Sequence, residues 1–384
     1  MTSLKSLTIH QFRGLRDLNL DNLGRINLLV GINNSGKTSV LEALAIYCHP
    51  LDIRVWLSTA RQREQENRIL RTPALDALRW LFTHNSAFDE EKKLQKCTIV
   101  ISSSGLFTVK KLIASYKDTE GIWLSEKRNQ RNFLNREEQI IENDDVPGVR
   151  KGIDLKIEVY TEQLSLFDET PTLSENFQLW EDEFLSGLSR KKEPSLKTSV
   201  VTPSSHRSEI GQFRLLSEAS FQNFKSDVIK LLQQMDKSIS DIEILLSPES
   251  TSSRFNIYIQ HDSLGLAPVS TFGDGIRRLL HIALQLANVK GGILLIDELE
   301  STIHTEALQN SFSWLVKWCL EMDIQLFATT HSLEAVDALL EVTDSDSDLV
   351  LYRLEPTKAQ TRVVRHDWNR LRRLREELGQ EVRW

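Results

Sequence analysis

The fold is decided by one stretch, Gly31-Ile32-Asn33-Asn34-Ser35-Gly36-Lys37-Thr38, which has the spacing G-x-x-x-x-G-K-[ST]. Residues 25–30 before it are mostly apolar and have the length of a buried strand, and the apolar residues of 38–46 recur at helical spacing. A glycine-rich loop between a strand and a helix points its backbone N–H groups and the positive end of the helix dipole at bound phosphate. The sequence therefore predicts a loop that binds a nucleoside triphosphate.

In a loop of this kind the lysine reaches the β- and γ-phosphates, and the hydroxyl that follows it coordinates Mg²⁺. We therefore expect ATP and Mg²⁺ as ligands, with Lys37 on the phosphates and Thr38 on the metal ion. The neighbouring residues expected to surround the nucleotide are Gly31, Asn33, Asn34, Ser35, Gly36 and Ser39.

The composition is that of an ordinary globular protein, with 26% charged and 40% hydrophobic residues among 384. The formal net charge of -7 means that any contact with nucleic acid has to come from a local basic patch. The scattered Cys48, Cys97 and Cys319 predict neither a disulfide framework nor a structural zinc site. Because no signal-peptide core or membrane-length apolar run is present, we expect a reducing cytoplasm as the setting.

Short apolar strands alternate with helices at both ends of the chain, which predicts an α/β fold with a mixed or parallel sheet around the phosphate loop. The two parts of this nucleotide-binding head are expected at residues 1–90 and 265–345. Residues 91–264 are expected to form an inserted α+β lobe, and residues 346–384 a C-terminal strand and a basic tail.

Three segments of the expected insertion are predicted in more detail. Residues 116–150 are strongly polar and indicate an exposed loop, and residues 161–208 indicate a surface linker. Residues 221–235 place their apolar side chains on one face and predict a single amphipathic helix. Strands are expected at 4–12, 15–20, 97–102, 107–113, 154–160, 242–246 and 255–259.

A second group of polar residues follows two further apolar strands. Asp297 and Glu298 come directly after the strand at 292–296, and His331 follows the strand at 324–330. Because ligands of open α/β sheets bind at the carboxyl ends of the strands, all three side chains are expected near the phosphate loop. Asp297 is expected to hold Mg²⁺, Glu298 to act as general base toward the attacking water, and His331 to sense the γ-phosphate.

As a set, these motifs resemble the ABC-type ATPases of the RecF/SMC/OLD group, within the AAA-family ATPases related to the OLD proteins. The resemblance covers roughly residues 1–50 and 265–345 and keeps the order of the family's motifs. Its segments are Ile9 to Leu15 (first strands), Gly31 to Thr38 (Walker A), Ser270 to Arg278 (signature segment in a "GDG" form), Asp297-Glu298 (Walker B), Glu300 to His304 (D-loop) and His331 (switch histidine).

The resemblance implies that ATP is hydrolysed in a sandwich dimer, where each ATP lies between one Walker A and the partner's signature segment. It also implies that Arg13 lies near adenine and phosphates, and that Gly273, Asp274 and Gly275 face a γ-phosphate in the other subunit. Arg277 or Arg278 would add positive charge. The chain departs from the family in its Gly-Asp-Gly, because Asp274 beside a phosphate is unfavourable unless it points away.

Two absences narrow the resemblance. Residues 50–265 carry no heptad repeat, which argues against the coiled coils of SMC and RecN proteins, and the roughly fifty residues after His331 are too few for the TOPRIM nuclease of OLD proteins. The resemblance then implies a stand-alone ATPase like those of the Septu and PARIS anti-phage systems. Such an ATPase would form an ATP-dependent dimer or larger homo-oligomer and gate an assembly with a separate effector, often a nuclease.

Two other functions remain open. One is a RecF-like ATPase that binds DNA during repair, and the other is a scaffold that ATP holds together with negligible turnover. The basic C-terminal segment is either a surface for nucleic acid or an acidic partner, or a solvated helix paired with nearby glutamates, and we favour the second. Its arginines are Arg362, Arg365, Arg370, Arg372, Arg373, Arg375 and Arg383, and the glutamates are Glu376, Glu377 and Glu381.

Overall fold

The structure is a computed structural model of the chain. The residues it describes are 3–64, 73–82, 98–123, 148–161, 170–181, 193–208, 211–246, 255–345, 348–357 and 360–384. Cys97 and residues 124–147 of the predicted polar loop lie outside these ranges.

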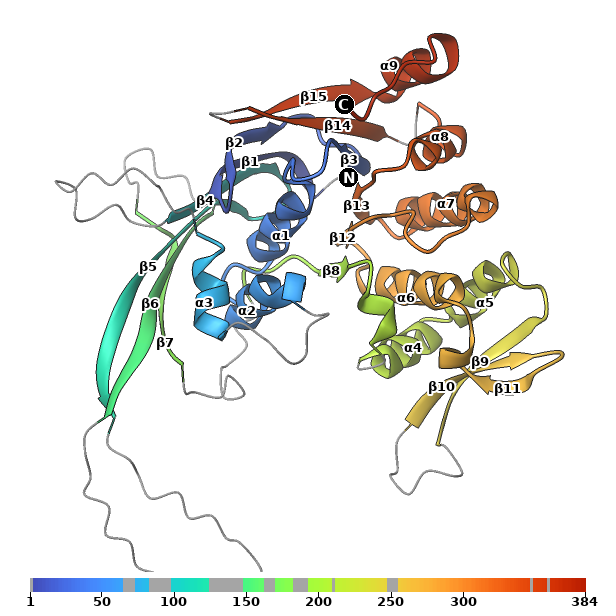
Figure 1. The fold of residues 1–384 in the computed structure, drawn as a ribbon, viewed down its shortest axis with the longest axis horizontal. Coiled ribbons are helices and arrows are strands. Elements are labelled where there is room, and N and C mark those ends of the chain that lie inside the picture. Colours follow the sequence, from blue (N-terminus) through green and yellow to red (C-terminus); the bar gives the residue numbers. More distant parts are fainter. Residues whose placement is uncertain are drawn as a thin grey trace, which may run out of the picture.

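The central sheet is built from six strands: β3 (Ile26–Val30), β8 (Thr198–Val201), β12 (Ile293–Ile296), β13 (Gln325–Thr329), β14 (Leu349–Pro356) and β15 (Thr361–Asp367). Their order is β15-β14-β3-β13-β12-β8 (Figure 1). Every neighbouring pair is parallel except β14 and β15. The predicted α/β class, with a mixed sheet around the phosphate loop, is therefore confirmed.

Alternation of side chains along β3 explains how helices cover both faces of this sheet. Leu28 and Val30 belong to the hydrophobic core that packs against α6 (Asp274–Asn288), α7 (Thr305–Glu321) and α8 (Leu333–Glu341). Leu29, between them, belongs to a second core with α1 (Lys37–Cys48), α2 (Ile53–Arg61) and α3 (Ala74–Arg79). The sheet consequently lies between two helical layers, as Figure 1 shows.

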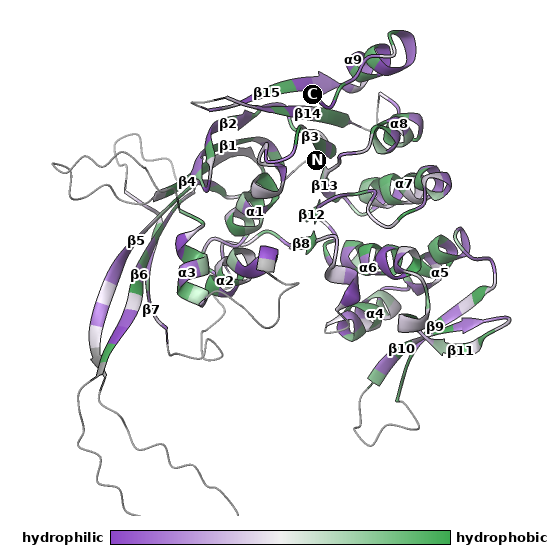
Figure 2. Ribbon diagram, viewed as in Figure 1, coloured by the Kyte–Doolittle hydropathy of each residue, from purple (hydrophilic) through white to green (hydrophobic). Residues whose placement is uncertain are grey.

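A second sheet is antiparallel throughout and has the order β2-β1-β4-β5-β6-β7. Its strands are β1 (Leu4–Phe12), β2 (Leu15–Leu20), β4 (Thr98–Gly105), β5 (Val109–Trp123), β6 (Gly148–Thr161) and β7 (Leu173–Trp180). Strands β5 and β6 form a long ribbon that projects from the head and alternates polar and apolar residues, whereas the central strands are mainly apolar (Figure 2). Gln325 of β13 joins this sheet to the central one, because its side-chain amide pairs with the N–H and C=O of Leu4.

The remaining sheet lies near α6 (Figure 1). A three-stranded sheet has the order β11-β10-β9 and contains β9 (Ile239–Leu246), β10 (Phe255–His261) and β11 (Gly265–Pro268). The other helices are α4 (Gln212–Phe221), α5 (Lys225–Gln233) and α9 (Trp368–Arg372). Short 3-10 turns occur at Gln62–Glu64, Ser205–Arg207 and Val269–Thr271, and a π-helical turn at Arg373–Glu377. No helix in the described part of the chain is long and apolar enough to cross a membrane.

Three details of the sequence prediction were wrong. The helix expected at 221–235 is shorter and begins at Lys225, as α5, because Asn223 adopts a left-handed conformation with φ 56° and separates it from α4, which ends at Phe221. Residues 116–123, expected to begin a polar loop, belong instead to β5, which pairs with β6 as far as Trp123. The linker expected at 161–208 contains β7 and β8, and β8 pairs with β12 as the edge of the central sheet.

The division of the chain at residues 91–264 stays a proposal. Strands β4 to β7 come from this segment and continue the sheet that β1 and β2 begin. Among the described strands, only β9 to β11 form a sheet that is built entirely from residues of this segment and the few residues that follow it. We therefore place the boundary of a separate lobe, with α4 and α5, after β8.

Candidate active site

The phosphate loop runs from the end of β3 to the start of α1, and two of its glycines cannot be replaced without strain. Gly31 and Gly36 have positive φ angles of 147° and 96°. A Cβ atom on Gly31 would lie 2.6 Å from the carbonyl oxygen of Leu354, and one on Gly36 would lie 2.5 Å from a methyl group of Leu15. The backbone path of the loop therefore depends on glycine at both positions. Asn33 and Asn34 lie on its exposed side.

Lys37 is almost fully buried within this loop. Its ammonium group donates to the carbonyl oxygens of Gly31 at 2.8 Å and Ile32 at 3.1 Å. Burial lowers the pKa of Lys37 below its ordinary value, and the carboxylates that follow β12 oppose the shift, Asp297 most strongly. The hydroxyl oxygen of Ser35 is buried without a hydrogen-bond partner in the described part of the protein. A cation and an unsatisfied hydroxyl group are thus held where a phosphate would need them.

The carboxylate of Asp297 lies opposite the first turn of α1. Thr38 Oγ1 donates to it, at 3.1 Å from Oδ2 and 3.2 Å from Oδ1. A second hydroxyl, Thr329 Oγ1 at the end of β13, donates to Oδ1 at 2.6 Å. Hydroxyl and carboxylate oxygens are the ligands that Mg²⁺ prefers, with the remaining positions filled by water and substrate phosphate. These residues therefore fit a magnesium ion.

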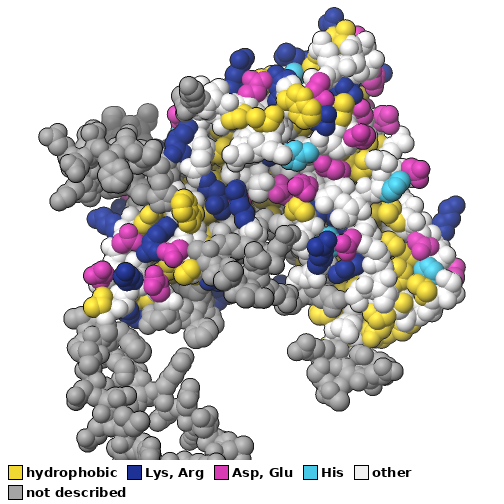
Figure 3. Space-filling model, viewed as in Figure 1, with side chains coloured by type: hydrophobic (Ala, Val, Ile, Leu, Met, Phe, Trp, Pro, Cys, Tyr) yellow, Lys and Arg dark blue, Asp and Glu magenta, His cyan; other side chains and the backbone are white. Residues whose placement is uncertain are grey.

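The described residues contain no group of three or more His, Cys, Asp or Glu side chains that could hold a metal ion. Figure 3 shows acidic side chains gathered near the middle of one face of the molecule, with basic side chains beside them. Magnesium shared between protein oxygens and triphosphate is the usual arrangement in nucleotide-hydrolysing sites.

Glu298 is half-buried and has a left-handed backbone conformation, with φ 51°. Burial raises the pKa of its carboxyl group above the ordinary value, and the charges of Asp297 and Glu300 add to this shift. Its N–H donates to Thr329 Oγ1 at 2.8 Å, so the same hydroxyl fixes both acidic residues. A carboxylate with a raised pKa next to a phosphate-binding loop has the properties of a general base.

The completely buried side chain of Arg278 supports the turn that contains Asp297 and Glu298. The guanidinium group donates to the carbonyl oxygens of Asp297 at 3.0 Å, Glu298 at 2.6 Å and Thr202 at 2.9 Å. Burial lowers the pKa of Arg278 to about 10, and the charges of Glu298, Glu300 and Asp297 oppose the shift. The residue therefore links α6 to the acidic turn and braces it instead of facing a partner.

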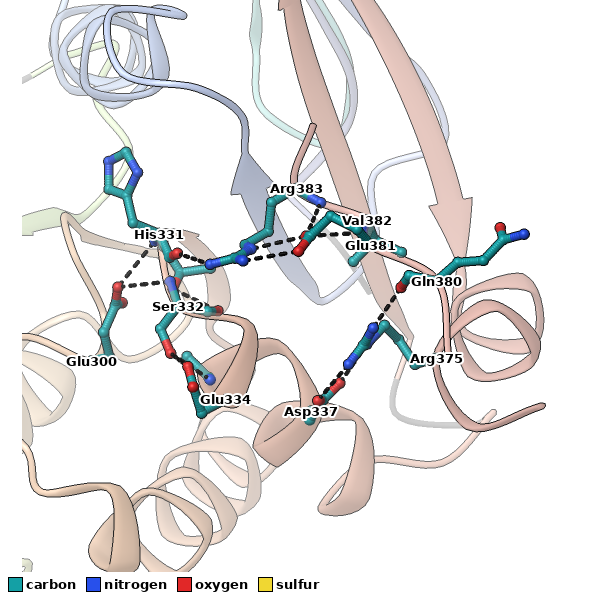
Figure 4. Close-up of polar contacts among 12 residues, drawn as sticks. Glu300, His331, Ser332, Glu334, Asp337, Arg375, Gln380, Glu381, Val382 and Arg383 are labelled. Atoms are coloured by element: carbon teal, nitrogen blue, oxygen red, sulfur yellow. Dashed lines mark hydrogen bonds and ion pairs between the residues drawn. The ribbon is translucent and has the colours of Figure 1, made fainter. Parts of the chain in front are cut away.

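His331 follows β13 in the loop that leads to α8. Glu300 Oε1 accepts a hydrogen bond from the N–H of His331 at 3.0 Å and from that of Ser332 at 3.2 Å. Ser332 also caps α8 by accepting from the N–H of Ala335 at 3.0 Å. The imidazole projects away from this network (Figure 4). Glu300, which lies in the expected D-loop, thus holds the backbone that presents the histidine.

Arg13 occupies the turn between β1 and β2 with a left-handed φ of 49°. Its Nε lies 2.8 Å from Oε2 of Glu42, which is buried in α1. Arg63 binds the same carboxylate at 2.7 Å and 2.8 Å and donates to Ser39 Oγ at 2.8 Å. Two arginines and Ser39 therefore meet on the side of the helix that begins at the phosphate loop.

The expected signature residues start α6. Asp274 is paired with Arg207 at 3.0 Å, Arg277 at 3.1 Å and His206 at 3.5 Å. The hydrogen bond from Arg207 is the main cause of the lowered pKa of Asp274. The carboxylate is thus neutralised by its own neighbours, which removes the conflict expected between Asp274 and a phosphate.

No hydrogen bond or ion pair among the described residues joins Gly273, Asp274 or Gly275 to the phosphate loop. The site therefore contains two separate groups: the loop with the ends of β12 and β13, and the start of α6. Sequence reasoning missed several residues that connect the first group: Thr329, Glu42, Arg63 and the bracing role of Glu300 and Arg278. Thr329 carried the one usable signal, because it ends β13 level with Asp297, one position after the paired Ile296 and Ala328.

Comparison with known families places the chain in a class. A family model described as an AAA ATPase domain matches residues 3–200, which is more than half of the chain. The chain belongs to this AAA ATPase domain family. A second model, whose description reads "AAA domain, putative AbiEii toxin, Type IV TA system", matches residues 157–337. The first match includes the phosphate loop, and the second includes Asp297, Glu298 and His331.

The chain is also similar to individual proteins. An ATP/GTP phosphatase of Helicobacter pylori is 23% identical over 360 residues, which are 88% of each chain. The DNA replication and repair protein RecF of Psychromonas ingrahamii is 42% identical over 66 residues, which are 17% of this chain and 18% of that protein. A crystal structure of an SMC head bound to the C-winged helix domain of ScpA superposes with a TM-score of 0.47 at 12% identity, covering 95% of this chain and 98% of that one.

Proposed function

We propose that the chain hydrolyses ATP in a Mg²⁺-dependent reaction at the loop of residues 31–38. The observation that carries the proposal is the contact between Thr38 Oγ1 and the Asp297 carboxylate at 3.1 Å, with the buried Lys37 ammonium beside it. Membership in the AAA ATPase domain family supports the choice of nucleotide. The similarity to an ATP/GTP phosphatase supports hydrolysis as the reaction.

In the proposed mechanism each residue has one task. Lys37 binds β- and γ-phosphate oxygens and offsets their charge. Glu298 accepts a proton from water as the water oxygen attacks the γ-phosphorus, and the bond from that phosphorus to the bridging oxygen breaks to leave ADP and phosphate. The raised pKa of Glu298 supports this assignment. His331 donates a hydrogen bond to a γ-phosphate oxygen and stabilises its charge.

Thr38 and Asp297 would hold the magnesium ion. When bound, Mg²⁺ supplies positive charge to the β- and γ-phosphate oxygens. Thr329 keeps the Asp297 carboxylate turned toward Thr38 through its 2.6 Å hydrogen bond. Arg13 and Ser39 contribute to the nucleotide site from the Glu42 side of α1.

We further propose that two copies of the chain form an ATP-sandwich dimer. Gly273, Asp274 and Gly275 would meet the γ-phosphate bound by the other copy. The support is that this segment opens α6, a helix of 15 residues whose N-terminus attracts anions, and that Arg207 and Arg277 surround Asp274. Each arginine can pair with a phosphate oxygen if its Asp274 contact loosens.

The proposed role of this dimer is to gate an assembly with a separate effector protein, of which a nuclease is the expected kind, in anti-phage defence in the cytoplasm. The supporting observation is that residues 157–337 match the AAA domain model whose description names a toxin of a type IV TA system. The alternative is a RecF-like ATPase that binds DNA, and the 66-residue match to RecF favours that reading. A third candidate, a scaffold with negligible turnover, is separated from both by the activity of Glu298→Gln.

The experiment is light scattering of the purified chain with and without ATP and Mg²⁺, using Glu298→Gln to block turnover. A shift from monomer to dimer on ATP supports the sandwich, and Asp274→Arg should abolish it by crowding like charges beside Arg207. Salt-sensitive binding of DNA by the ATP-bound dimer would favour the repair role. A monomer under both conditions would remove the proposal of a sandwich for the isolated chain.

A further inference from the structure

Residues 375–383 lie near the loop that carries His331, and Arg383 binds this loop from 52 positions further along the chain (Figure 4). Arg383 Nη1 donates to the carbonyl oxygen of His331 at 2.7 Å. The other nitrogens of the guanidinium group, Nε and Nη2, bind the carboxylate of Glu381 at 2.9 Å and 2.8 Å. Val382, between them, is buried. The guanidinium group is thus oriented by a two-point ion pair before it reaches the histidine.

The backbone of His331 is held from its other side as well. Its N–H donates to Glu300 Oε1, which follows β12, while its C=O accepts from Arg383. Both polar groups of one residue are therefore satisfied by charged side chains from distant segments. Fixing these two groups fixes the backbone dihedral angles of His331 and, through them, the direction of its imidazole.

Arg375 anchors the same segment to the helix that begins at this loop. Its Nε and Nη2 bind the carboxylate of Asp337 in α8 at 2.7 Å and 2.8 Å, and it also donates to the carbonyl oxygen of Gln380. Residues 375–383 consequently connect α8 to the loop that carries His331.

We propose that Arg383 is a positioning residue that sets the orientation of His331 for the γ-phosphate. The proposal rests on the proposed function of His331. The hydrogen bond from Arg383 lowers the pKa of Glu381 to about 2, so the ion pair that orients the guanidinium group persists at every pH where the enzyme would work. In this proposal Arg383 acts through the histidine, whose carbonyl oxygen it binds.

The first test compares three variants by ATPase kinetics and thermal melting. Arg383→Ala should lower kcat roughly tenfold and leave the KM for ATP within about twofold, because chemistry depends on the imidazole but nucleotide binding does not. Arg383→Lys should recover part of the rate, since one ammonium donor still reaches the carbonyl oxygen. Arg372→Ala is the matched control and should leave kcat unchanged, because Arg372 is exposed and its contacts among the described residues are with Glu376 and Trp368.

The decisive measurement is a double-mutant cycle with His331→Ala. If Arg383 acts through the histidine, Arg383→Ala should cause no further loss in the His331→Ala background. An equal tenfold loss in both backgrounds would overturn the inference, and so would wild-type kcat in Arg383→Ala. If His331→Ala itself retains full kcat, the proposed function of the histidine fails instead. Should Arg383→Ala not fold, Glu381→Gln and Arg383→Lys replace it, and wild-type kcat in both would overturn the inference.

Discussion

The hydroxyl of Thr38 lies 3.1 Å from Oδ2 of Asp297, although 259 positions separate the two residues in the chain. Their strands are not neighbours, because β13 lies between β3 and β12 in the sheet. The contact forms because α1 begins just after the carboxyl end of β3, and its first turn meets Asp297, which follows the parallel strand β12 at the same edge of the sheet. The two oxygens on which the proposed magnesium site depends are therefore positioned by the sheet and not by local sequence.

Replacing Thr38 by alanine should weaken magnesium binding at the site. The variant removes one oxygen ligand, so we expect ATPase activity at limiting Mg²⁺ to fall about a hundredfold and to recover in part at high Mg²⁺. A magnesium titration of the ATPase rate at fixed ATP measures this. Thr38→Ser keeps the hydroxyl and is the control. An unchanged magnesium requirement in Thr38→Ala would rule out Thr38 as a ligand.

Glu298→Gln should lower kcat by about 10²–10³, because glutamine cannot accept the proton of the attacking water. The raised pKa of Glu298 shifts the acid limb of the wild-type pH–rate profile upward from the ordinary glutamate range, and the variant should lose that limb. A profile of kcat against pH for both proteins tests the assignment. Persistent turnover in Glu298→Gln would exclude Glu298 as the base.

The same substitution should stabilise the fold at neutral pH. Since the folded carboxyl has the raised pKa, the folded state binds more protons than the unfolded state between the two pKa values. The stability of the wild-type protein therefore decreases as the pH rises through this window, whereas the neutral glutamine escapes the cost. Calorimetry should show a higher Tm for Glu298→Gln at pH 7 and a smaller difference in acid. A lower Tm at pH 7 would contradict the electrostatic account.

Arg278→Met should lower the free energy of unfolding by about 3 kcal/mol, because it leaves three carbonyl groups around a buried site without their donor. Urea unfolding provides the measurement. Arg277→Met, at the preceding position of the same helix, removes a partly exposed ion pair with Asp274 and should cost less than about 1 kcal/mol. Equal losses in the two variants would show that Arg278 is not the brace.

His281 should make the protein less stable in mild acid. Burial lowers its pKa to about 4, and the nearby charges of His206 and Arg278 act in the same direction. The unfolded state, with a pKa of about 6.5, binds more protons in between, so stability falls by up to about 3 kcal/mol as the pH drops from about 6.5 to 4. His281→Gln should flatten this dependence in urea unfolding, and replacement of the exposed His304 should not. Parallel curves for wild type and His281→Gln would refute the assignment.

The sequence was most informative where one short segment contains the whole signal. The buried strand, glycine loop and helix at residues 26–48 are adjacent in the chain, so their order and limits could be predicted. Asp297, Glu298 and His331 were likewise placed at strand ends from the apolar runs before them. The fold class followed from the same alternation of strands and helices.

Features that depend on distant partners could not be predicted. Strand β8 is short and lies in a polar segment, and it is a strand because β12 pairs with it. Glu300 and Arg383 hold His331 through backbone groups, which carry no mark in the sequence. The C-terminal arginines fit the pairing interpretation in part, since Arg372, Arg373 and Arg383 pair with Glu376, Glu377 and Glu381. Arg375, however, binds Asp337 of α8, and Arg383 also reaches the loop before that helix.

The position of β3 between β13 and β14 has a consequence for biosynthesis. Both neighbours of this strand are made about three hundred residues after it, so an emerging chain carries an apolar strand with two unpaired edges until β13 and β14 have been synthesised. Contacts this remote in sequence slow folding and favour aggregation. Expression at reduced temperature, or together with a chaperone that shields such edges, should therefore raise the yield of folded protein more than any change to the surface.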